Sequence, residues 1–354
     1  MWKNVKNESE HGKAFISYFH IQSHFSHSIT LTSPRDLPAW ALAAAALRAG
    51  QPAALLCVVR SAGSSPGRQG FKMAVTPTAA AGSIGGGIVE HKWVELARQR
   101  LRAADFAPLL RPQIHRPSAP ADRSGLMCSG EQEVLLWPLQ AGDLPVVAAI
   151  EAALGALAGG AFELSEAQGL RLLVDEMPAD FYDYRPGPDW RYREQLGFRD
   201  RLTIVGGGHV SRALARAAGA LNFEITVLDD RPDLPTLAAN DDAHHRHVLG
   251  YDALAAAVPE GPHRYVVVMT VGYRTDAVAL RQLLGRAYAY LGVMGSAAKV
   301  AELRRALLAA GFSAGDVARL RGPIGVPISS RTPEEIAVSV AAELIAVRNA
   351  SPAT

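Results

Sequence analysis

The sequence predicts a two-domain α/β protein, in which an N-terminal α/β domain is followed by a Rossmann-like, doubly wound parallel sheet domain. Two glycine-rich turns, and a second half that alternates short apolar runs with helical stretches, indicate this class. The 354 residues, 49% of them hydrophobic, suffice for two domains with separate cores. A formal net charge of +2 without a polybasic run argues against nucleic acid or an anionic membrane as a partner.

The N-terminal part begins with a polar segment and continues as an α/β domain. Residues 1–35 show neither a signal-peptide nor a transit-peptide pattern, so we expect a disordered leader and a cytoplasmic protein. Residues 36–140 are predicted as the first domain. Its expected elements are a helix at 37–48, strands at 53–60 and 71–76, a helix at 88–102 and a strand at 131–137.

The rest of the chain is predicted as a connection and a second domain. Residues 141–200 combine an apolar helix with a polar stretch rich in proline and aromatic residues, which predicts a helix and a linker arm. The C-terminal domain is expected over 201–350. Its last helix begins with a capping box of Thr332 and Glu335, and its apolar stripe packs inward or against a second copy in a homodimer. The expected strands of this domain are 202–205, 224–228, 245–249, 265–270 and 288–294.

The second glycine turn, which runs from Gly206 to Gly208, has the spacing of a dinucleotide-binding turn. It follows a strand and opens a helix, and Asp229 and Asp230 end the next strand. In such a turn a pyrophosphate rests on the helix N-terminus and the acid binds a ribose hydroxyl, so NAD is one candidate ligand. His209 is either a neutral donor to a ligand phosphate or an exposed surface histidine. The same turn also closes many sheets that bind nothing.

The first glycine turn, residues 82–87, is a second candidate for anion binding. Backbone amides without a neighbouring Cβ, serine hydroxyls and a lysine are groups that hold a phosphate or a pterin. Glu90, on the following helix, can bond a ring N–H of a heterocycle or occupy the exposed face. Such a turn can also be only a tight turn. The residues assigned to ligand binding around it are Ser64, Ser65, Lys72, Ser83, Gly85, Gly86, Gly87 and Glu90.

The two cysteines have different surroundings. Cys57 lies in an apolar run that predicts a buried strand, so we expect an unreactive core thiol. Cys128 lies in a loop between glycine and serine residues, where a thiol is accessible. It can be a soft metal ligand, a nucleophile, a sulfur acceptor or an ordinary loop cysteine.

These segments occur in a fixed order along the chain and together resemble one family. The segments are Gly63-Ser64-Ser65-Pro66, Gly70-Phe71-Lys72-Met73, residues 82–87 with Glu90, Cys128, Gly206-Gly207-Gly208-His209-Val210, Asp230-Arg231-Pro232, residues 291–296, Pro323-Ile324-Gly325 and residues 332–339. The series resembles the xanthine dehydrogenase accessory family, also called XdhC/CoxI, over about residues 60–345.

The resemblance implies a non-catalytic maturation factor. Members bind the molybdenum cofactor (molybdopterin), hold it while a cysteine desulfurase supplies sulfur, and deliver it to a xanthine dehydrogenase-type molybdoenzyme. The family's cysteine corresponds to Cys128, which is thereby implied in cofactor and metal binding. The chain departs from the family pattern at residues 270–276, where Val271 and Tyr273 stand in place of histidines, and therefore resembles a divergent branch.

Two other functions remain open from the residues alone. The second glycine turn with Asp229 is compatible with an NAD-dependent oxidoreductase, although no proton-transfer residue can be identified for it. A regulatory module that senses a nucleotide is the third possibility. The carrier hypothesis adds one geometric expectation, namely that Cys128 and both glycine turns meet in one cleft between the domains.

Overall fold

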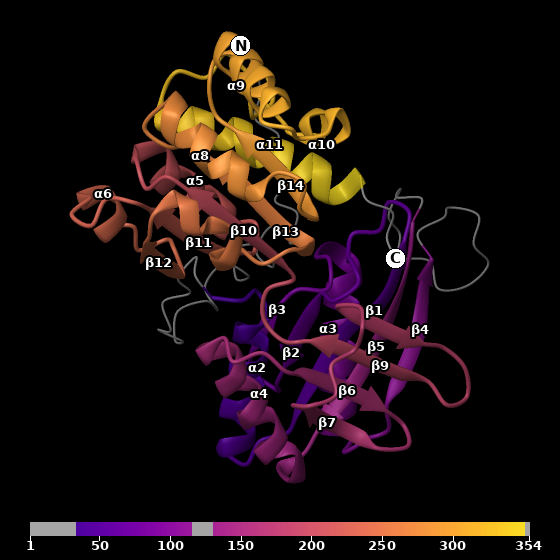
Figure 1. Ribbon diagram of the computed structural model, residues 1–354. Coiled ribbons are helices and arrows are strands. Elements are labelled where there is room, and N and C mark those ends of the chain that lie inside the picture. The colour runs from indigo at the N-terminus through magenta and orange to yellow at the C-terminus, as the bar shows by residue number, and fades with distance from the viewer. Residues whose placement is uncertain (1–32, 115–129, 351–354) are drawn as a thin grey trace, which may run out of the picture.

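The computed structural model describes residues 33–114 and 130–350 and shows two α/β domains (Figure 1). Two antiparallel sheets with their helices form the N-terminal domain. A parallel sheet with helices on both faces forms the C-terminal domain. The predicted fold class is therefore confirmed.

The first sheet of the N-terminal domain is buried on both faces. Its strands are β1 (Ala53–Ala62), β2 (Lys72–Val75), β3 (Ala80–Gly82), β4 (Leu109–Ile114) and β5 (Glu131–Leu139), in the spatial order β3-β2-β1-β5-β4. Leu55 and Cys57 point to one face, while Leu56 and Val58 point to the other, under helix α3 (Gly87–Arg102). Burial on both faces explains why β1 is a continuous apolar run rather than an alternating one.

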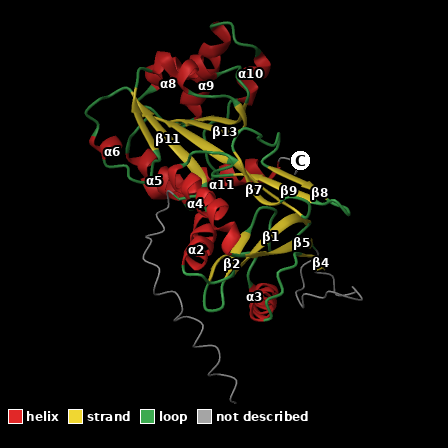
Figure 2. Ribbon diagram, turned by 90° about the horizontal axis from the view of Figure 1, so that it is seen from below, coloured by secondary structure: helices red, strands yellow, loops and turns green. Residues whose placement is uncertain are grey.

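Helices α2 (Leu37–Arg48) and α4 (Leu144–Ala156) pack together on the face opposite α3 (Figure 2). The short helix η3 (Ala141–Asp143) leads into α4. Both α2 and α4 have a proline near their first residue. Backbone N–H groups at that position have no intrahelical partner, so a residue without an N–H fits there.

A second antiparallel sheet stands where the sequence suggested a linker arm. Its strands are β6 (Ala161–Ser165), β7 (Gly169–Leu173), β8 (Tyr182–Arg185) and β9 (Arg191–Gln195), in the order β7-β6-β9-β8. Phe162, Leu164 and Tyr192 alternate with charged residues and enter the core of the N-terminal domain. The difference has a physical cause, because alternation over four or five residues is a weak signal beside the prolines that separate these strands.

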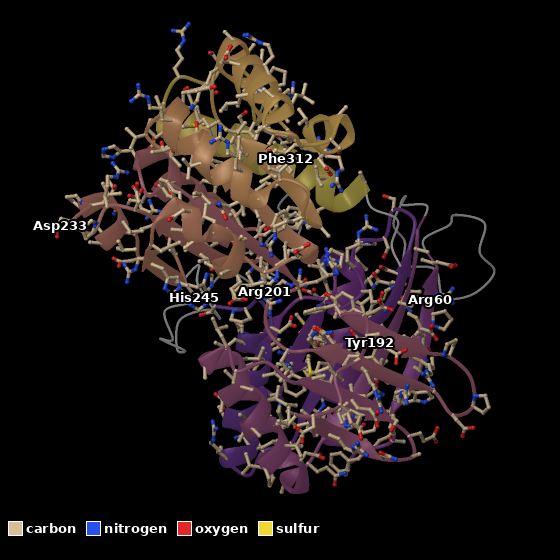
Figure 3. All side chains as sticks on the ribbon, in the orientation of Figure 1. Arg60, Tyr192, Arg201, Asp233, His245 and Phe312 are labelled. Carbon is tan, nitrogen blue, oxygen red and sulfur yellow. The ribbon has the colours of Figure 1, made fainter. Side chains whose placement is uncertain are left out.

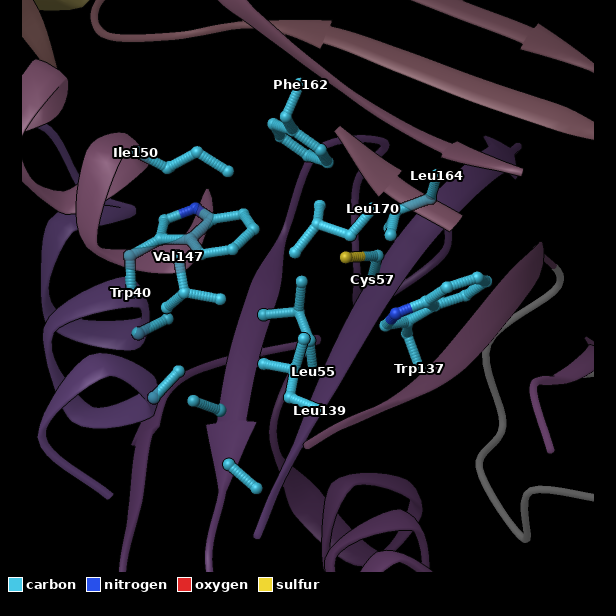
Figure 4. Packing of buried hydrophobic residues seen from close by; sticks show 14 of the residues in the cluster. Trp40, Leu55, Cys57, Trp137, Leu139, Val147, Ile150, Phe162, Leu164 and Leu170 are labelled. Carbon is cyan, nitrogen blue, oxygen red and sulfur yellow. The ribbon is translucent and has the colours of Figure 1, made fainter. Parts of the chain in front are cut away.

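The core between the two sheets contains Cys57 (Figure 4). Its side chain is buried among Trp137, Leu170 and neighbouring aliphatic residues, and burial raises the pKa of the thiol. Trp40 of α2 packs edge-on against Phe162 of β6, with ring centroids 5.2 Å apart. The prediction of an unreactive core thiol at Cys57 is confirmed.

The C-terminal domain is a parallel sheet in the order β12-β11-β10-β13-β14, the doubly wound arrangement. The strands are β10 (Asp200–Val205), β11 (Phe223–Asp229), β12 (His245–Val248), β13 (Gly261–Val268) and β14 (Tyr288–Val293). The helices are α5 (His209–Gly219), α6 (Pro235–Ala238), η4 (Tyr251–Ala253), α7 (Leu254–Ala257), α8 (Tyr273–Leu283), α9 (Ala297–Ala309), α10 (Ala314–Arg319) and α11 (Pro333–Ala350). Helices α5 and α11 cover one face, and α7, α8 and α9 cover the other.

The domains meet at the N-terminal edge of the parallel sheet. The Arg35 N–H donates to Asn222 Oδ1 at 2.9 Å, and Asn222 directly precedes β11. Figure 3 places Arg201, at the start of β10, beside the N-terminal domain, whereas Asp233, which follows β11, lies at the far end. The N-terminal domain therefore faces the edge of the sheet opposite to the strand C-termini.

Candidate functional site

The first glycine turn is filled by a carboxylate of the chain itself. Glu90 Oε2 accepts hydrogen bonds from the Ile84 N–H at 2.9 Å, the Gly86 N–H at 2.9 Å and the Ser83 hydroxyl at 2.6 Å. The Gly85 N–H donates in turn to Ser83 Oγ at 3.1 Å. The amides that the sequence assigned to an external phosphate thus hold an internal anion, because α3 places Glu90 one turn after the loop.

The first glycine turn packs tightly against the loop at residues 63–67. A Cβ on Gly67 would lie 2.2 Å from Ile84 O, and one on Gly85 would lie 2.5 Å from Gly67 N. Gly85 also has φ +125, a region that side chains rarely adopt. The glycines here allow two backbone segments to touch. A high number of glycines therefore indicates close packing as much as access for a ligand.

Buried Gln132 of β5 ties these loops together, and the sequence analysis missed it. Its Oε1 accepts the Gly67 N–H at 2.9 Å and lies 2.8 Å from the Ser65 hydroxyl. Ser65, predicted as a ligand-binding residue, is buried and serves this network, whereas Ser64 is exposed. The apolar run after Gln132 marks a strand but does not tell which face the glutamine takes.

The structure corrects the ligand-binding role that was predicted for Lys72. Its side chain is fully buried, and its ammonium donates to Glu194 Oε1 at 2.5 Å and to Gly70 O at 2.7 Å, with Asp36 Oδ2 at 2.9 Å. Burial alone would lower the pKa of Lys72, but Asp36 and Glu194 outweigh it and the pKa is raised. The lysine therefore joins the two sheets and α2, and it does not reach a surface ligand.

Cys128 lies outside the described residues, but the chain two residues later is placed. Gly130 is buried against the loop at 63–67, since a Cβ there would lie 2.4 Å from Ser64 C and from Ser65 N. The segments 63–67, 82–87 and 130–132 therefore meet at one place in the N-terminal domain. Of the residues predicted there, Ser64, Ser83 and Gly87 are exposed, and Gly85, Gly86 and Glu90 are partly exposed.

The second glycine turn lies at the opposite edge of the parallel sheet and is open. A Cβ on Gly206 would lie 2.4 Å from Met269 O, so this glycine allows β10 and β13 to approach. Nothing lies within 4 Å of a Cβ on Gly208, and His209, the first residue of α5, is exposed. The first turn of α5 contains no acidic residue. The Gly206 N–H donates to Leu228 O and the Gly207 N–H donates to Asp229 Oδ2, so an anion at this turn would use the amides at the start of α5.

Asp229 supports the second glycine turn from behind. The fully buried carboxylate accepts hydrogen bonds from the Gly207 N–H at 2.7 Å and from the Arg231 guanidinium at 2.8 Å on each oxygen. Burial alone would raise the pKa of Asp229, but Arg231 and the Gly207 N–H lower it. The predicted role of Asp229 on a ribose is corrected, because both oxygens are occupied. Asp230 is exposed.

A polar network lines the neighbouring strand ends, and sequence reasoning did not single it out. Buried Asp276 accepts from the Thr270 hydroxyl at 2.5 Å and forms an ion pair with Lys299, whose ammonium also donates to Met294 O at 3.1 Å. Thr270 follows β13 and Met294 follows β14, so the network borders the crevice where doubly wound sheets bind ligands. Val271, which follows Thr270, is 73% exposed.

The two glycine turns do not share a cleft within one chain. The first begins beside the domain contact, because the Ser83 N–H donates to Lys72 O and Lys72 pairs with Asp36. The second lies beyond the length of β10, whose six residues span about 20 Å at roughly 3.3 Å each. The expected convergence of both turns on one interdomain cleft is therefore wrong for this chain.

Other features of the described residues mark no further site at the turns. Two hollows of about 450 and 620 Å³ lie over β6 and β9 and along β14, and no residue of either turn lines them. Within residues 33–114 and 130–350, no three His, Cys, Asp or Glu side chains gather as a metal site would require. No helix in those ranges has the length and apolar character needed to cross a bilayer.

Fold and site together define a two-domain α/β protein in which a Rossmann domain follows a domain built around the first glycine turn. Comparison with known families agrees for both halves. Residues 202–344 match the XdhC Rossmann domain, and residues 46–111 match the XdhC and CoxI family. The chain belongs to the XdhC and CoxI family.

Individual relatives match part of the chain. YqeB, an uncharacterized protein of Escherichia coli (strain K12), is 36% identical over 157 residues, which cover 44% of this chain and 29% of that protein. A probable xanthine dehydrogenase component of Bacillus subtilis (strain 168) is 31% identical over 158 residues, 42% of this chain and 43% of that one. The matched residues thus span less than half of either curated relative.

One solved structure shares the fold over nearly the whole chain. It is the crystal structure of a xanthine dehydrogenase from Bacillus halodurans, with a TM-score of 0.64 and 21% sequence identity. The match covers 90% of this chain and 98% of that one. At this level of identity the likeness establishes the arrangement of both domains and not the chemistry of a site.

Proposed function

We propose that this protein is a maturation factor that binds the molybdenum cofactor, protects it while sulfur is added, and delivers it to a xanthine dehydrogenase-type molybdoenzyme. Membership of the XdhC and CoxI family supports this role. In this proposal the protein is a carrier in the cytoplasm, and a cysteine desulfurase supplies the sulfur.

The observation that carries the proposal is the meeting of three segments in the N-terminal domain. Loop 63–67, the first glycine turn and Gly130 are far apart in sequence and pack against one another within van der Waals distance. Ser64 and Glu90 offer polar atoms at this surface. Cys128 is close to Gly130 in sequence, and we assign it the role of soft ligand.

The residues present fit part of the cofactor. The bound cofactor would supply a metal–sulfur centre, for which Cys128 is the matching protein atom. Ser64 and Glu90 fit the polar edge of its ring system, since they offer a hydroxyl and a carboxylate. A phosphate does not fit the first glycine turn, where Glu90 already uses the amides of Ile84 and Gly86. The open amides at Gly208 fit a phosphate better, but they lie across the sheet.

The separation of the turns limits the alternative functions. An NAD-dependent oxidoreductase would use an acid at the end of β11 on the ribose, and Asp229 is occupied by Arg231 and the Gly207 N–H, which leaves exposed Asp230 for that role. We therefore propose that the N-terminal site holds the cofactor and that the second glycine turn is not part of the same pocket within one chain. A homodimer is the arrangement in which a second copy would bring that turn closer.

Retention of the cofactor tests the proposal. The full chain is incubated with molybdenum cofactor released from a molybdoenzyme and freed of unbound material, and bound pterin and molybdenum are measured. We expect about one equivalent on the wild type and a loss of at least tenfold for Cys128→Ser. Cys57→Ala is the matched control and should retain the cofactor, because that thiol is buried in the core. Trace retention by the wild type would contradict the proposal.

A further inference from the structure

Hydrogen bonds to one oxygen, Oε2, fix the orientation of the Glu90 carboxylate. Oε2 accepts three hydrogen bonds, from two backbone amides and the Ser83 hydroxyl, all within 2.9 Å. Within the parts of the chain that the structure describes, no group donates to Oε1. Hydrogen bonds to an ionised acceptor are the stronger class, so they fix the carboxylate plane and leave one oxygen available.

The negative charge of Glu90 favours a ligand that donates a hydrogen bond over an anionic ligand. No arginine, lysine or histidine among residues 33–114 and 130–350 forms an ion pair with Glu90, so its negative charge is balanced only by N–H and O–H dipoles. A phosphate approaching the first glycine turn would meet this charge and find the amides of Ile84 and Gly86 in use. A neutral N–H group would meet an acceptor that is already oriented.

The backbone beside Glu90 leaves room for a flat ligand. Gly86 and Gly87 have φ +76 and +67, and a Cβ on either would meet nothing within 4 Å. Gly87 and Ser83 are exposed, while Glu90 is half-buried. The turn therefore presents a carboxylate oxygen next to backbone without side chains, which is how proteins let a ring approach closely.

We propose that the first glycine turn binds a planar heterocycle through an N–H or amino edge accepted by Glu90, and that it excludes phosphate. This inference rests on the proposed function in so far as a pterin is such a heterocycle. It reverses the charge preference that glycine-rich turns usually have, because the anion site is occupied from within. Glu90 is thus a specificity-determining residue for the ring and not for the phosphate.

A pair of probes that differ only in donor groups tests this assignment. The full chain is titrated, by pterin fluorescence, with 6-hydroxymethylpterin and with its 2-dimethylamino analogue, which lacks the amino N–H donors. We expect the wild type to prefer the first by about tenfold or more, and millimolar inorganic phosphate not to compete. Glu90→Gln, which turns an N–H donor toward the ligand, should reduce the preference to within about twofold.

Two control variants separate an effect on ligand recognition from an effect on the fold. Glu95→Gln makes the same change of charge on α3 at a residue that pairs with Arg98 and lies one turn after Glu90, so the preference should remain. Ser83→Ala removes one donor to Glu90 and should lower the melting temperature while keeping the preference. Circular dichroism verifies the fold of each variant.

Several results would overturn the inference. They are equal affinity of the wild type for both pterins, no binding of either pterin at millimolar concentration, an unchanged preference in Glu90→Gln, and competition by phosphate. Failure here while the wild type still retains the whole cofactor leaves the carrier function standing. Discrimination between the pterins without retention of the cofactor would reject the carrier function and keep the role of Glu90.

Discussion

The two glycine turns are alike in composition but differ in how the chain itself uses their backbone amides. In the first, the fourth residue of the following helix is Glu90, whose carboxylate takes up the amides of the turn. In the second, the fourth residue of the following helix is Arg212, which is exposed, and no acid stands in the first turn of α5. The carboxylate of Glu90 takes two amides of the first turn, whereas in the second turn Asp229 takes the Gly207 N–H from the side of the sheet and the start of α5 offers no carboxylate to the amides that follow.

This contrast shows that glycine density alone does not predict an anion site. Glycines supply amides without a neighbouring Cβ, but the nearest carboxylate decides whether those amides are free. A scan for glycine-rich turns should therefore also consider the first turn of the next helix. The buried charged groups next to the two turns differ as well. They are Lys72 with its two carboxylates in the N-terminal domain and the Asp229–Arg231 pair in the C-terminal domain.

The largest effect is expected from removing the support behind the first turn. Lys72→Met leaves the carboxylates of Glu194 and Asp36 in the interior without their cation, and breaking a buried pair in this way costs about 3–5 kcal/mol. Urea unfolding at about pH 8, above the pKa of about 7 of Glu194, measures the loss with that carboxylate ionised. The exposed Lys92→Met on α3 is the control and should change the free energy of unfolding by less than about 0.5 kcal/mol. Equal stability of both variants would show that Lys72 has no structural role.

A smaller effect is expected behind the second turn. Asp229→Asn keeps an acceptor for the Gly207 N–H but removes the charge that pairs with Arg231, whose side chain is 42% exposed. Because solvent screens part of this pair, we expect a loss of about 1–2 kcal/mol in thermal or urea unfolding. Asp230→Asn changes the same charge one residue later at an exposed position and should be nearly neutral. A larger loss for Asp230→Asn would contradict this assignment.

The sequence predicts this molecule best where a signal is local and long. The capping box of α11 is present, with the Glu335 N–H donating to Thr332 Oγ1 at 3.2 Å and the Thr332 N–H donating to Glu335 Oε2 at 3.1 Å. The parallel sheet follows from repeated strand and helix patterns. Side-chain direction is harder, because Lys72 begins a four-residue strand and nothing local shows that it faces Glu194, more than a hundred residues later.

The site was predicted less well for the same reason. That Glu90 belongs to the first turn could be read from its place in the following helix, but not that it fills the turn. Gln132 had no local signal, since its role depends on the packing of β5 against loop 63–67. The role of Asp229 depended on Arg231, two residues later, whose guanidinium turns back onto the carboxylate.

The two domains should respond to pH in opposite directions. Burial raises the pKa of Glu194 to about 7, with Lys72 opposing and Asp36 adding to the shift. The native state then holds a proton that the unfolded state releases above about pH 4.5, so the N-terminal domain loses stability as pH rises toward 7, by at most about 1.4 kcal/mol per unit. Asp229, with its lowered pKa, stabilises the C-terminal domain above about pH 4 and loses this contribution as pH falls.

Hydrogen exchange resolved by domain, corrected for intrinsic rates, measures this difference between pH 5 and 7. Protection of β1 and β9 should fall with rising pH, while protection of β10 and β11 should not. Glu194→Gln should flatten the dependence of the N-terminal domain, because position 194 then carries no carboxyl that can lose the proton. A rise in protection of β9 toward pH 7 would mean that Glu194 titrates near its ordinary range.

The smallest effect comes from making the second turn resemble the first. Arg212→Glu places a carboxylate at the matched position of α5, where it can accept from the open amides and interacts favourably with the helix N-terminus, a gain of about 0.5–1 kcal/mol. Exchange of the Gly208 and His209 amides should slow by roughly two- to fivefold. Arg216→Glu, one turn further along α5, is the control and should leave these amides unchanged. If the turn amides exchange as fast in Arg212→Glu as in the wild type, the identity of the fourth helical residue does not decide closure. The backbone difference between Gly86 at φ +76 and Gly208 at φ −73 would then be the deciding feature.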